Sequence, residues 1–129
     1  MVSLTNAVST RTVNEGGYFK YTSTLLDEDS TALALASVDT LTMTLYEVQG
    51  DTVINSRSAQ DVLNTNSVTL HATSGLLTWT ALAADNPIVN SPGAGEYEQH
   101  IAVFTLTYST TKTLNHEVAI YVKQLNKIT

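Results

Sequence analysis

The residues of this chain that could do chemistry gather in its last third, in the stretch GEYEQHIAVFTLTY (95–108) and in the NHEV that follows it. Glu96, Glu98 and His100 open the first stretch, and His116 stands in the second. Histidine and carboxylate bind zinc and other divalent ions. A metal site or an acid–base cluster is therefore the first hypothesis that the sequence raises.

Strand geometry argues against a shared metal ion. Residues 97–108, a half-apolar run, and residues 114–122, in which every second residue from Leu114 shares a face, are predicted as strands. The link STTKT between them has the length of a hairpin loop. Antiparallel pairing through that link places His116 near Leu106, about six residues along the strand from His100, or roughly 20 Å. Ligands of one ion lie within about 2–2.5 Å of it, so no metal site and no cofactor are predicted.

Glu98 and His100 remain as a pair. They stand at positions i and i+2, so they share one face of the predicted strand. Polar groups at the end of a strand are usually satisfied by their neighbours. We therefore predict a structural hydrogen bond in which Glu98 holds His100 at the mouth of the fold.

Other catalytic patterns are missing from the sequence. There is no Gly-x-Ser-x-Gly elbow, no glycine-rich phosphate loop before a helix, and no cysteine. The acidic triplet at 27–29 lacks the spacing of a calcium-binding EF-hand loop. No catalytic residue is predicted and the chain is expected not to be an enzyme, with a small hydrolase or metalloprotein as the third-ranked hypothesis.

Aromatic residues offer a different kind of site. Six tyrosines and one tryptophan could form a platform on which sugars stack, provided that several of them share an exposed surface. Trp79 is in phase with Leu77 and is expected in the core. Tyr18 and Tyr121 are out of phase with the predicted buried faces, so they are the candidate exposed aromatics. A carbohydrate-binding module is therefore the alternative function.

The composition limits the partners. The chain has 129 residues, which suits one domain, and a net charge of -6 from 12 acidic and 6 basic residues. Direct binding to nucleic acid needs a basic surface and is not expected. The absence of cysteine favours folding in a reducing cytoplasm. The first residues lack the pattern of a signal peptide, and no segment is long and apolar enough to suggest a membrane partner.

Alternation of apolar and polar residues predicts the fold. The run TLTMTLY (40–46) puts leucines and a methionine on one face and threonines on the other. The run SVTLHATSGLLTWTAL (67–82) is typical of a hairpin with a left-handed Gly75 in its turn. We predict an all-β antiparallel sandwich of about seven to eight strands, with an N-terminal arm over residues 1–14 and a single domain over residues 15–129.

Several of these motifs occur together in a known group of proteins. They are a hairpin that closes on Gly75–Trp79, a loop that bears Asp85, a Glu-x-His-x-Ala-x-Phe strand (98–104) and a closing His-Glu-Val strand (116–118). This combination, spread over residues 41–125, resembles the small immunoglobulin-like structural proteins of tailed bacteriophages. The resemblance implies that the β-sandwich is immunoglobulin-like.

The resemblance also implies a function and a location. Members of that group decorate capsids, complete head–tail joints or sit on tails and fibres, so the chain is expected to be a non-enzymatic virion component made in the host cytoplasm. Its expected partners are other phage structural proteins of the capsid, portal or tail, bound in multiple copies or as a homo-oligomer. Charged residues make up only 14% of the chain, which agrees with a surface that touches neighbours. In the alternative, the chain is a carbohydrate-binding module with which a phage attaches to its host.

Overall fold

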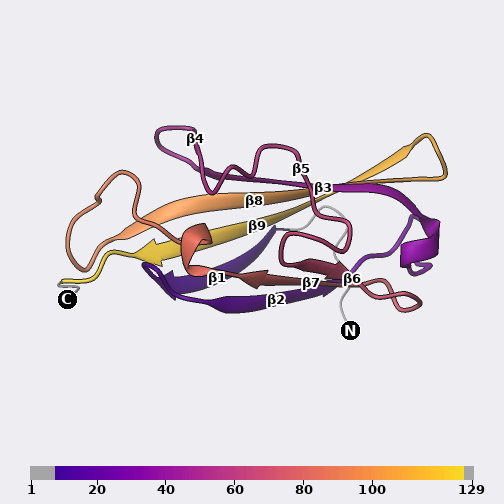
Figure 1. Cartoon of the computed structure of the whole chain (residues 1–129), viewed down its shortest axis with the longest axis horizontal. Helices are drawn as coiled ribbons and strands as arrows, with labels where there is room; N and C mark the ends of the chain where they lie inside the picture. Colours follow the sequence, from indigo (N-terminus) through magenta and orange to yellow (C-terminus); the bar gives the residue numbers. More distant parts are fainter. Residues whose placement is uncertain (1–7, 127–129) are drawn as a thin grey trace.

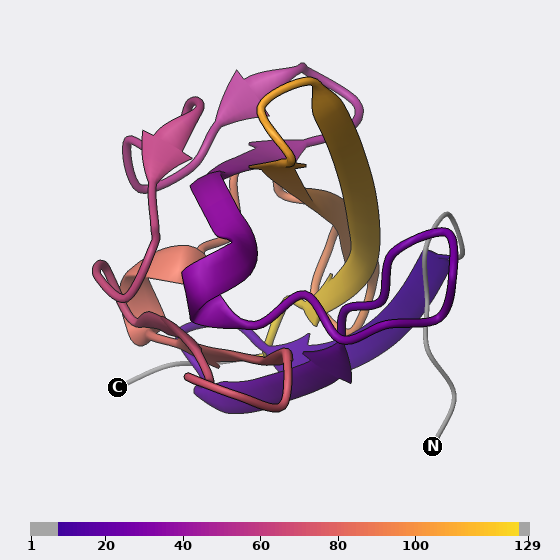
Figure 2. The ribbon, with the colours of Figure 1, turned by 90° about the vertical axis from the view of Figure 1, so that its right-hand side faces the viewer.

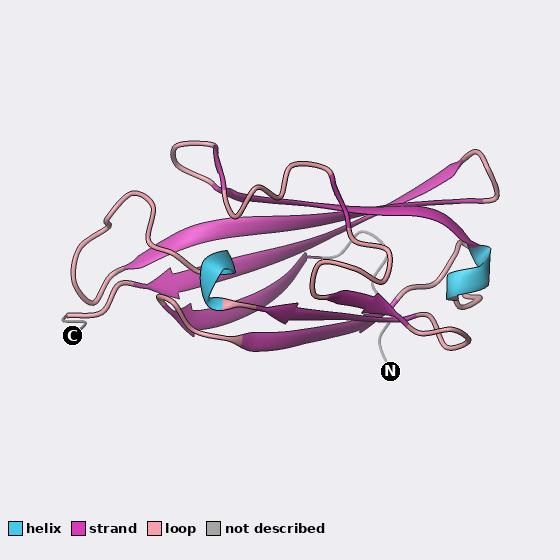
Figure 3. Cartoon of the chain, in the orientation of Figure 1, coloured by secondary structure: helices cyan, strands magenta, loops and turns pink. Residues whose placement is uncertain are grey.

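Two packed β-sheets make up residues 8–126, the part of the chain that the computed structural model describes (Figure 1). The strands are β1 (Val8–Asn14), β2 (Phe19–Thr24), β3 (Val38–Glu47), β4 (Thr52–Val53), β5 (Gln60–Asp61), β6 (Val68–Leu70), β7 (Leu76–Ala81), β8 (Tyr97–Tyr108) and β9 (Lys112–Lys123). Two short 3-10 turns, η1 (Leu35–Ser37) and η2 (Ala83–Asp85), occupy little of the chain (Figure 3). The predicted all-β class is confirmed. Within residues 8–126, no helix has the length and apolar character to cross a membrane.

The strand order defines a larger mixed sheet and a smaller antiparallel one. The larger sheet has the order β1-β9-β8-β3-β4, and β5 pairs with a further stretch of β3. The smaller sheet has the order β2-β7-β6. The prediction of a purely antiparallel sandwich is wrong for one pair, because β1 and β9 run parallel. No hairpin joins these two strands, since β1 leads instead into β2 of the opposite sheet.

The predicted N-terminal arm is corrected by β1. Residues 8–14 pair with β9 along their whole length, from Val8 opposite Glu117 to Asn14 opposite Lys123. Thr10 and Thr12 are exposed on β1, whereas Val13 packs against the core. The polar sequence of β1 is therefore that of an edge strand with one solvent-exposed face. Residues 15–129 are therefore not the whole domain. Residues 1–7 of the predicted arm lie outside the described residues.

The core fills the space between the two sheets. Leu41, Met43 and Leu45 point into it from β3, as their alternation predicts. Trp79 is fully buried, with its ring centroid 5.1 Å from that of Phe19 and 5.8 Å from that of Phe104. These contacts join strands of both sheets into one hydrophobic core.

The hairpin between β6 and β7 has the predicted pairing. Val68 lies opposite Trp79 and Leu70 opposite Leu77. Gly75 takes a φ of +73°, and a Cβ at that position would lie 3.0 Å from the backbone oxygen of Leu25. Glycine is therefore favoured there for both its conformation and its small size.

Loops close the two ends of the sandwich. Figure 2 looks onto one end, where η1 lies across the opening between the sheets. At the other end, the turn that follows β3 meets the long loop 86–96 that leads into β8, through a hydrogen bond between Asn90 and Glu47. This second end brings together most of the polar side chains that could form a site.

Candidate functional site

Glu98 and His100 lie next to each other on the inward face of β8, near the start of the strand. Glu98 Oε2 is 2.5 Å from His100 Nε2, and both side chains are buried. The same carboxylate accepts the backbone N–H groups of Val89 at 2.8 Å and Asn90 at 2.7 Å. Glu98 therefore fastens both the histidine and the long loop 86–96 to the strand.

The hydrogen bonds decide the charge of Glu98. Burial by itself raises the pKa of this carboxyl, but the hydrogen bonds from His100 and from the backbone of Asn90 and Val89 outweigh burial and hold the pKa below its usual value. Glu98 is therefore ionised near neutral pH. A low pKa and oxygens that already accept three hydrogen bonds make it a weak general base.

Glu47 is a second buried carboxylate, which sequence analysis missed. It lies directly opposite His100 across the β3–β8 pair and is 2% exposed. Its oxygens accept the backbone N–H groups of Gln49 at 2.8 Å and Gly50 at 2.7 Å, and the side-chain amide of Asn90. The signal in the sequence is its phase, because Glu47 continues the inward series of β3. Glu47, Glu98, His100 and Asn90 are called the carboxylate cluster below.

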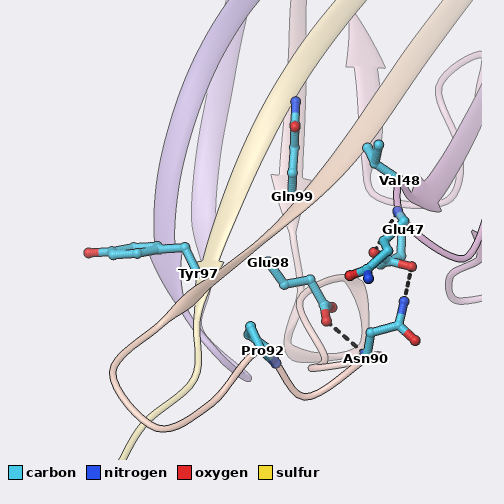
Figure 4. A pocket seen from close by; sticks show the side chains of 8 residues that line it. Glu47, Val48, Asn90, Pro92, Tyr97, Glu98 and Gln99 are labelled. Carbon is cyan, nitrogen blue, oxygen red and sulfur yellow. Dashed lines mark hydrogen bonds between the residues drawn. The ribbon is translucent and has the colours of Figure 1, made fainter.

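A small cleft of about 210 Å³ opens beside the carboxylate cluster (Figure 4). Eight residues line it: Glu47, Val48, Gln49, Asn90, Pro92, Tyr97, Glu98 and Gln99. In Figure 4 the carboxylates of Glu47 and Glu98 both turn toward Asn90, whereas the ring of Tyr97 points away from them. The carboxylates are at most 4% exposed and already accept hydrogen bonds from the loops, so a ligand in the cleft would compete with the loops for these oxygens.

Asp85 forms a second buried polar cluster, with Arg57. Its Oδ1 accepts from Arg57 Nε at 2.7 Å and from Asn55 Nδ2 at 2.8 Å, and its Oδ2 accepts from the backbone N–H of Leu82 at 3.0 Å. Burial by itself raises the pKa of Asp85, but these bonds together hold the pKa below its usual value. The ion pair is fully buried and ties the segment before β5 to the loop after β7, so its geometry fits a structural role.

His116 lies in the core, away from the carboxylate cluster. It is opposite Phe104, whereas His100 is opposite Ile120, so the two histidines stand four positions apart along β8. Four residues correspond to roughly 13 Å, which is too far for one ion. Among residues 8–126, no three His, Cys, Asp or Glu side chains are placed to hold a metal.

The predicted register of β8 and β9 is wrong by two residues. The loop between them is only Ser109–Thr111, because Ser109 and Thr110 adopt φ values of +50° and +58° and reverse the chain within three residues. Neither residue is a glycine, so the sequence carries no signal for this tight turn.

The partner of His116 is a tyrosine. The Nε2 atom of His116 shares a hydrogen bond with the hydroxyl of Tyr21, and the two rings are stacked with centroids 5.7 Å apart. The guanidinium carbon of Arg11, from β1, lies 4.9 Å from the centre of the Tyr21 ring. Burial lowers the pKa of His116, so this imidazole is neutral near pH 7.

The tyrosines divide between the surface and the sheet faces. Tyr18 is 70% exposed, whereas Tyr121 is half-buried, so the expectation of an exposed side chain is wrong for Tyr121. Its neighbours across the sheet, Gln99 and Thr12, flank it. Tyr97, which sequence analysis did not select, is 49% exposed beside the cleft.

The fold and these clusters define the chain as an all-β sandwich domain whose buried polar groups hold its loops. Neither the known protein-family models nor the curated proteins contain a match to it.

Proposed function

We propose that this chain is an immunoglobulin-like structural protein of a tailed-phage virion, which binds other virion proteins through its surface and has no enzymatic activity. It would act at the capsid, the head–tail joint or the tail, in multiple copies. The proposal rests on the motif resemblance and on two features of the structure.

The strand order supports the immunoglobulin-like part of the proposal. In immunoglobulin domains one sheet contains strands B, E and D, and the other contains C, F and G, with extra strands after C in the variable type. Here β2, β7 and β6 take the places of B, E and D, and β3, β8 and β9 those of C, F and G. The short strands β4 and β5 follow β3 and pair with its outer edge, where the variable type has its additions.

The observation that carries the non-enzymatic part is the use of the buried polar groups. Glu47, Glu98 and Asp85 each accept hydrogen bonds from two or more backbone or side-chain donors, and each is at most 4% exposed. Groups that hold loops in this way stabilise the fold and are poorly placed to meet a substrate. Since the buried polar groups are occupied in holding the loops, we assign binding of other proteins to the surface of the domain.

Particle composition tests the proposal. Virions of the phage that encodes the chain would be purified on a density gradient, and the chain quantified by mass spectrometry against the major capsid protein. We expect many copies per particle that persist after a high-salt wash. Presence in the infected-cell lysate together with absence from washed particles would refute the virion assignment.

A carbohydrate-binding module is the second candidate, favoured by the exposed Tyr97, which shares the outward face of β8 with Gln99. An aromatic face with polar side chains nearby is the arrangement that sugars require. A glycan array probed with the wild type and with Tyr97→Ala distinguishes the candidates. Binding lost in the variant would favour this second function, and silence with both proteins would remove it.

A further inference from the structure

The outer face of the larger sheet contains apolar residues that do not belong to the core. Ile101 on β8 and Ala119 on β9 lie side by side across the two strands, and they are only 6% and 4% exposed. Their strand neighbours His100, Ala102, Val118 and Ile120 point inward, so alternation turns Ile101 and Ala119 outward. They are also absent from the contiguous core cluster.

Half-buried residues surround this pair on the same face. Tyr46 lies opposite Ile101, Gln99 opposite Tyr121, and Val103 is two positions further along β8. These six residues, Tyr46, Gln99, Ile101, Val103, Ala119 and Tyr121, are called the outer patch. It is continuous with the cleft, because Gln99 lines both. Ile101 and Ala119 are covered within the chain, so the half-buried side chains around them form the part of the patch that another molecule can contact.

Two charged side chains flank the outer patch on β9, and they have opposite signs. Glu117 and Lys123 are both half-buried on the outward face, three positions on either side of Ile120. The chain as a whole has a net charge of -6, yet this pair is locally neutral. A second copy can therefore approach this face without the repulsion that the net charge would otherwise cause.

We propose that a second copy of this chain binds here, with the two outer patches stacked face to face around a two-fold axis. The axis lies in the interface and crosses β9 at right angles near Ile120. It superposes β9 on the partner's β9 in the opposite direction, which places Glu117 of each copy opposite Lys123 of the other. A two-fold interface must be self-complementary, and the spacing of these two charges meets that requirement.

The size of the face fits such a pair. Strands β1, β9, β8 and β3 lie side by side, and the longest of them has 12 residues. With strands about 4.8 Å apart and about 3.4 Å per residue, the face measures on the order of 800 Å². This is a projected area, wide enough to seat the same face of a second copy, and the half-buried side chains around Ile101 and Ala119 would supply the contact. Stacked sheets also pack with their strands nearly aligned, as the charge pairing requires.

The proposal depends on the surface-binding part of the proposed function and not on the virion assignment. A dimer in solution can form whether or not the chain is found in particles, so failure of one does not imply failure of the other.

Sedimentation equilibrium of the full chain tests the dimer through a charge-exchange cycle. We expect the wild type to approach twice its monomer mass of 13.9 kDa as concentration rises. Glu117→Lys alone and Lys123→Glu alone each place like charges opposite one another, twice per dimer, and should raise the dissociation constant about tenfold or more. The double variant Glu117→Lys/Lys123→Glu restores both pairs and should return within about threefold of the wild type.

Lys20→Glu is the matched control, since Lys20 is exposed on β2 of the other sheet and makes the same change of charge as Lys123→Glu. It should leave the dissociation constant unchanged. All of these positions are at the surface, so folding is expected to survive, as circular dichroism would verify. A wild type that stays monomeric, single variants without effect, or a double variant no better than the singles would each overturn the proposed interface.

Discussion

The two buried histidines, His100 and His116, lie on the inward faces of neighbouring strands, yet the first lies beside a charged group and the second does not. His100 contacts Glu98, whose pKa is held low by hydrogen bonds, so a charge is kept inside the protein there. His116 contacts the hydroxyl of Tyr21, and burial lowers the pKa of His116, so a charge is kept out of the core there. Burial alone therefore does not set the charge of a polar group; the donors that point at it do.

This difference corresponds to two structural tasks. The carboxylate cluster lies at the end of the sandwich, where backbone N–H groups of two loops need acceptors, and ionised carboxylates supply them. The pair of Tyr21 and His116 joins the two sheets through the core, since Tyr21 belongs to β2 and His116 to β9. A neutral hydrogen bond suits that position because it brings no charge into the interior.

Deletion of residues 1–14 should cause the largest loss of unfolding free energy, and it should do so by disturbing the surroundings of Tyr21 and His116. The deletion removes β1 and with it Val13, which packs on the core, and Arg11, which covers the Tyr21 ring. Uncovering on the order of 160 Å² of apolar surface should cost about 4 kcal/mol of unfolding free energy. Urea denaturation measures this loss. Deletion of residues 1–7 is the control, because it leaves β1 intact, and an equal loss for both deletions would contradict the assigned role of β1.

Glu98→Ala should lower the unfolding free energy by about 3 kcal/mol, and it should act on the carboxylate cluster. The substitution leaves two backbone N–H groups of the long loop and the ring of His100 without their acceptor, and buried donors without partners are costly. Loop 86–96 should then become susceptible to proteolysis while the rest of the domain stays resistant. Limited proteolysis with mass spectrometry locates the cuts, and cleavage elsewhere first would count against the assigned anchor.

Tyr21→Phe should have a smaller effect, about 1–2 kcal/mol, because it removes one hydroxyl and keeps the ring. His116 Nδ1 already has no hydrogen-bond partner within the described residues, so the variant would leave Nε2 without its observed partner as well. Tyr18→Phe is the matched control, since that hydroxyl belongs to a residue that is 70% exposed. Equal unfolding free energies for the two variants would show that the core hydrogen bond contributes nothing.

Local patterns of sequence predicted the strands well, and the missed features depend on contacts between distant segments. The bounds of β8 agree with prediction because buried residues recur at every second position from Glu98 to Tyr108, with the outward Ile101 buried as well. The pairing of Asp85 with Arg57, 28 residues away, leaves no periodic trace in the sequence. The same holds for β1, whose polar residues suit an arm or an edge strand equally well until β9 is known to lie beside it.

The candidate site was predicted only where a single strand determines it. Glu98 and His100 are two positions apart on β8, and the structure brings them together. Glu47 joins them from β3, and Asn90 from the loop, through a register that no local pattern specifies. The sequence therefore predicted one hydrogen bond of the carboxylate cluster, whereas five others to Glu47 and Glu98 were missed.

Lowering the pH should reduce the unfolding free energy first through His116 and then through Glu98, and each change should be smaller than those of the variants above. The folded pKa of His116 lies below 6.5, so its contribution to stability is complete above pH 6.5 and declines as the pH falls below that value, by at most about 1.4 kcal/mol per pH unit. The folded pKa of Glu98 lies below 4.5, so its contribution is present above about pH 4.5 and is lost as the pH falls through its folded pKa. Urea midpoints measured from about pH 7.5 to about pH 3.5 should therefore fall in two stages. His116→Gln should abolish the upper stage alone, whereas His71→Gln, at an exposed position, should leave both stages in place. A midpoint that stays constant between about pH 7.5 and pH 5 in the wild type would mean that His116 binds protons equally well folded and unfolded, and the contrast between the two histidines would fail.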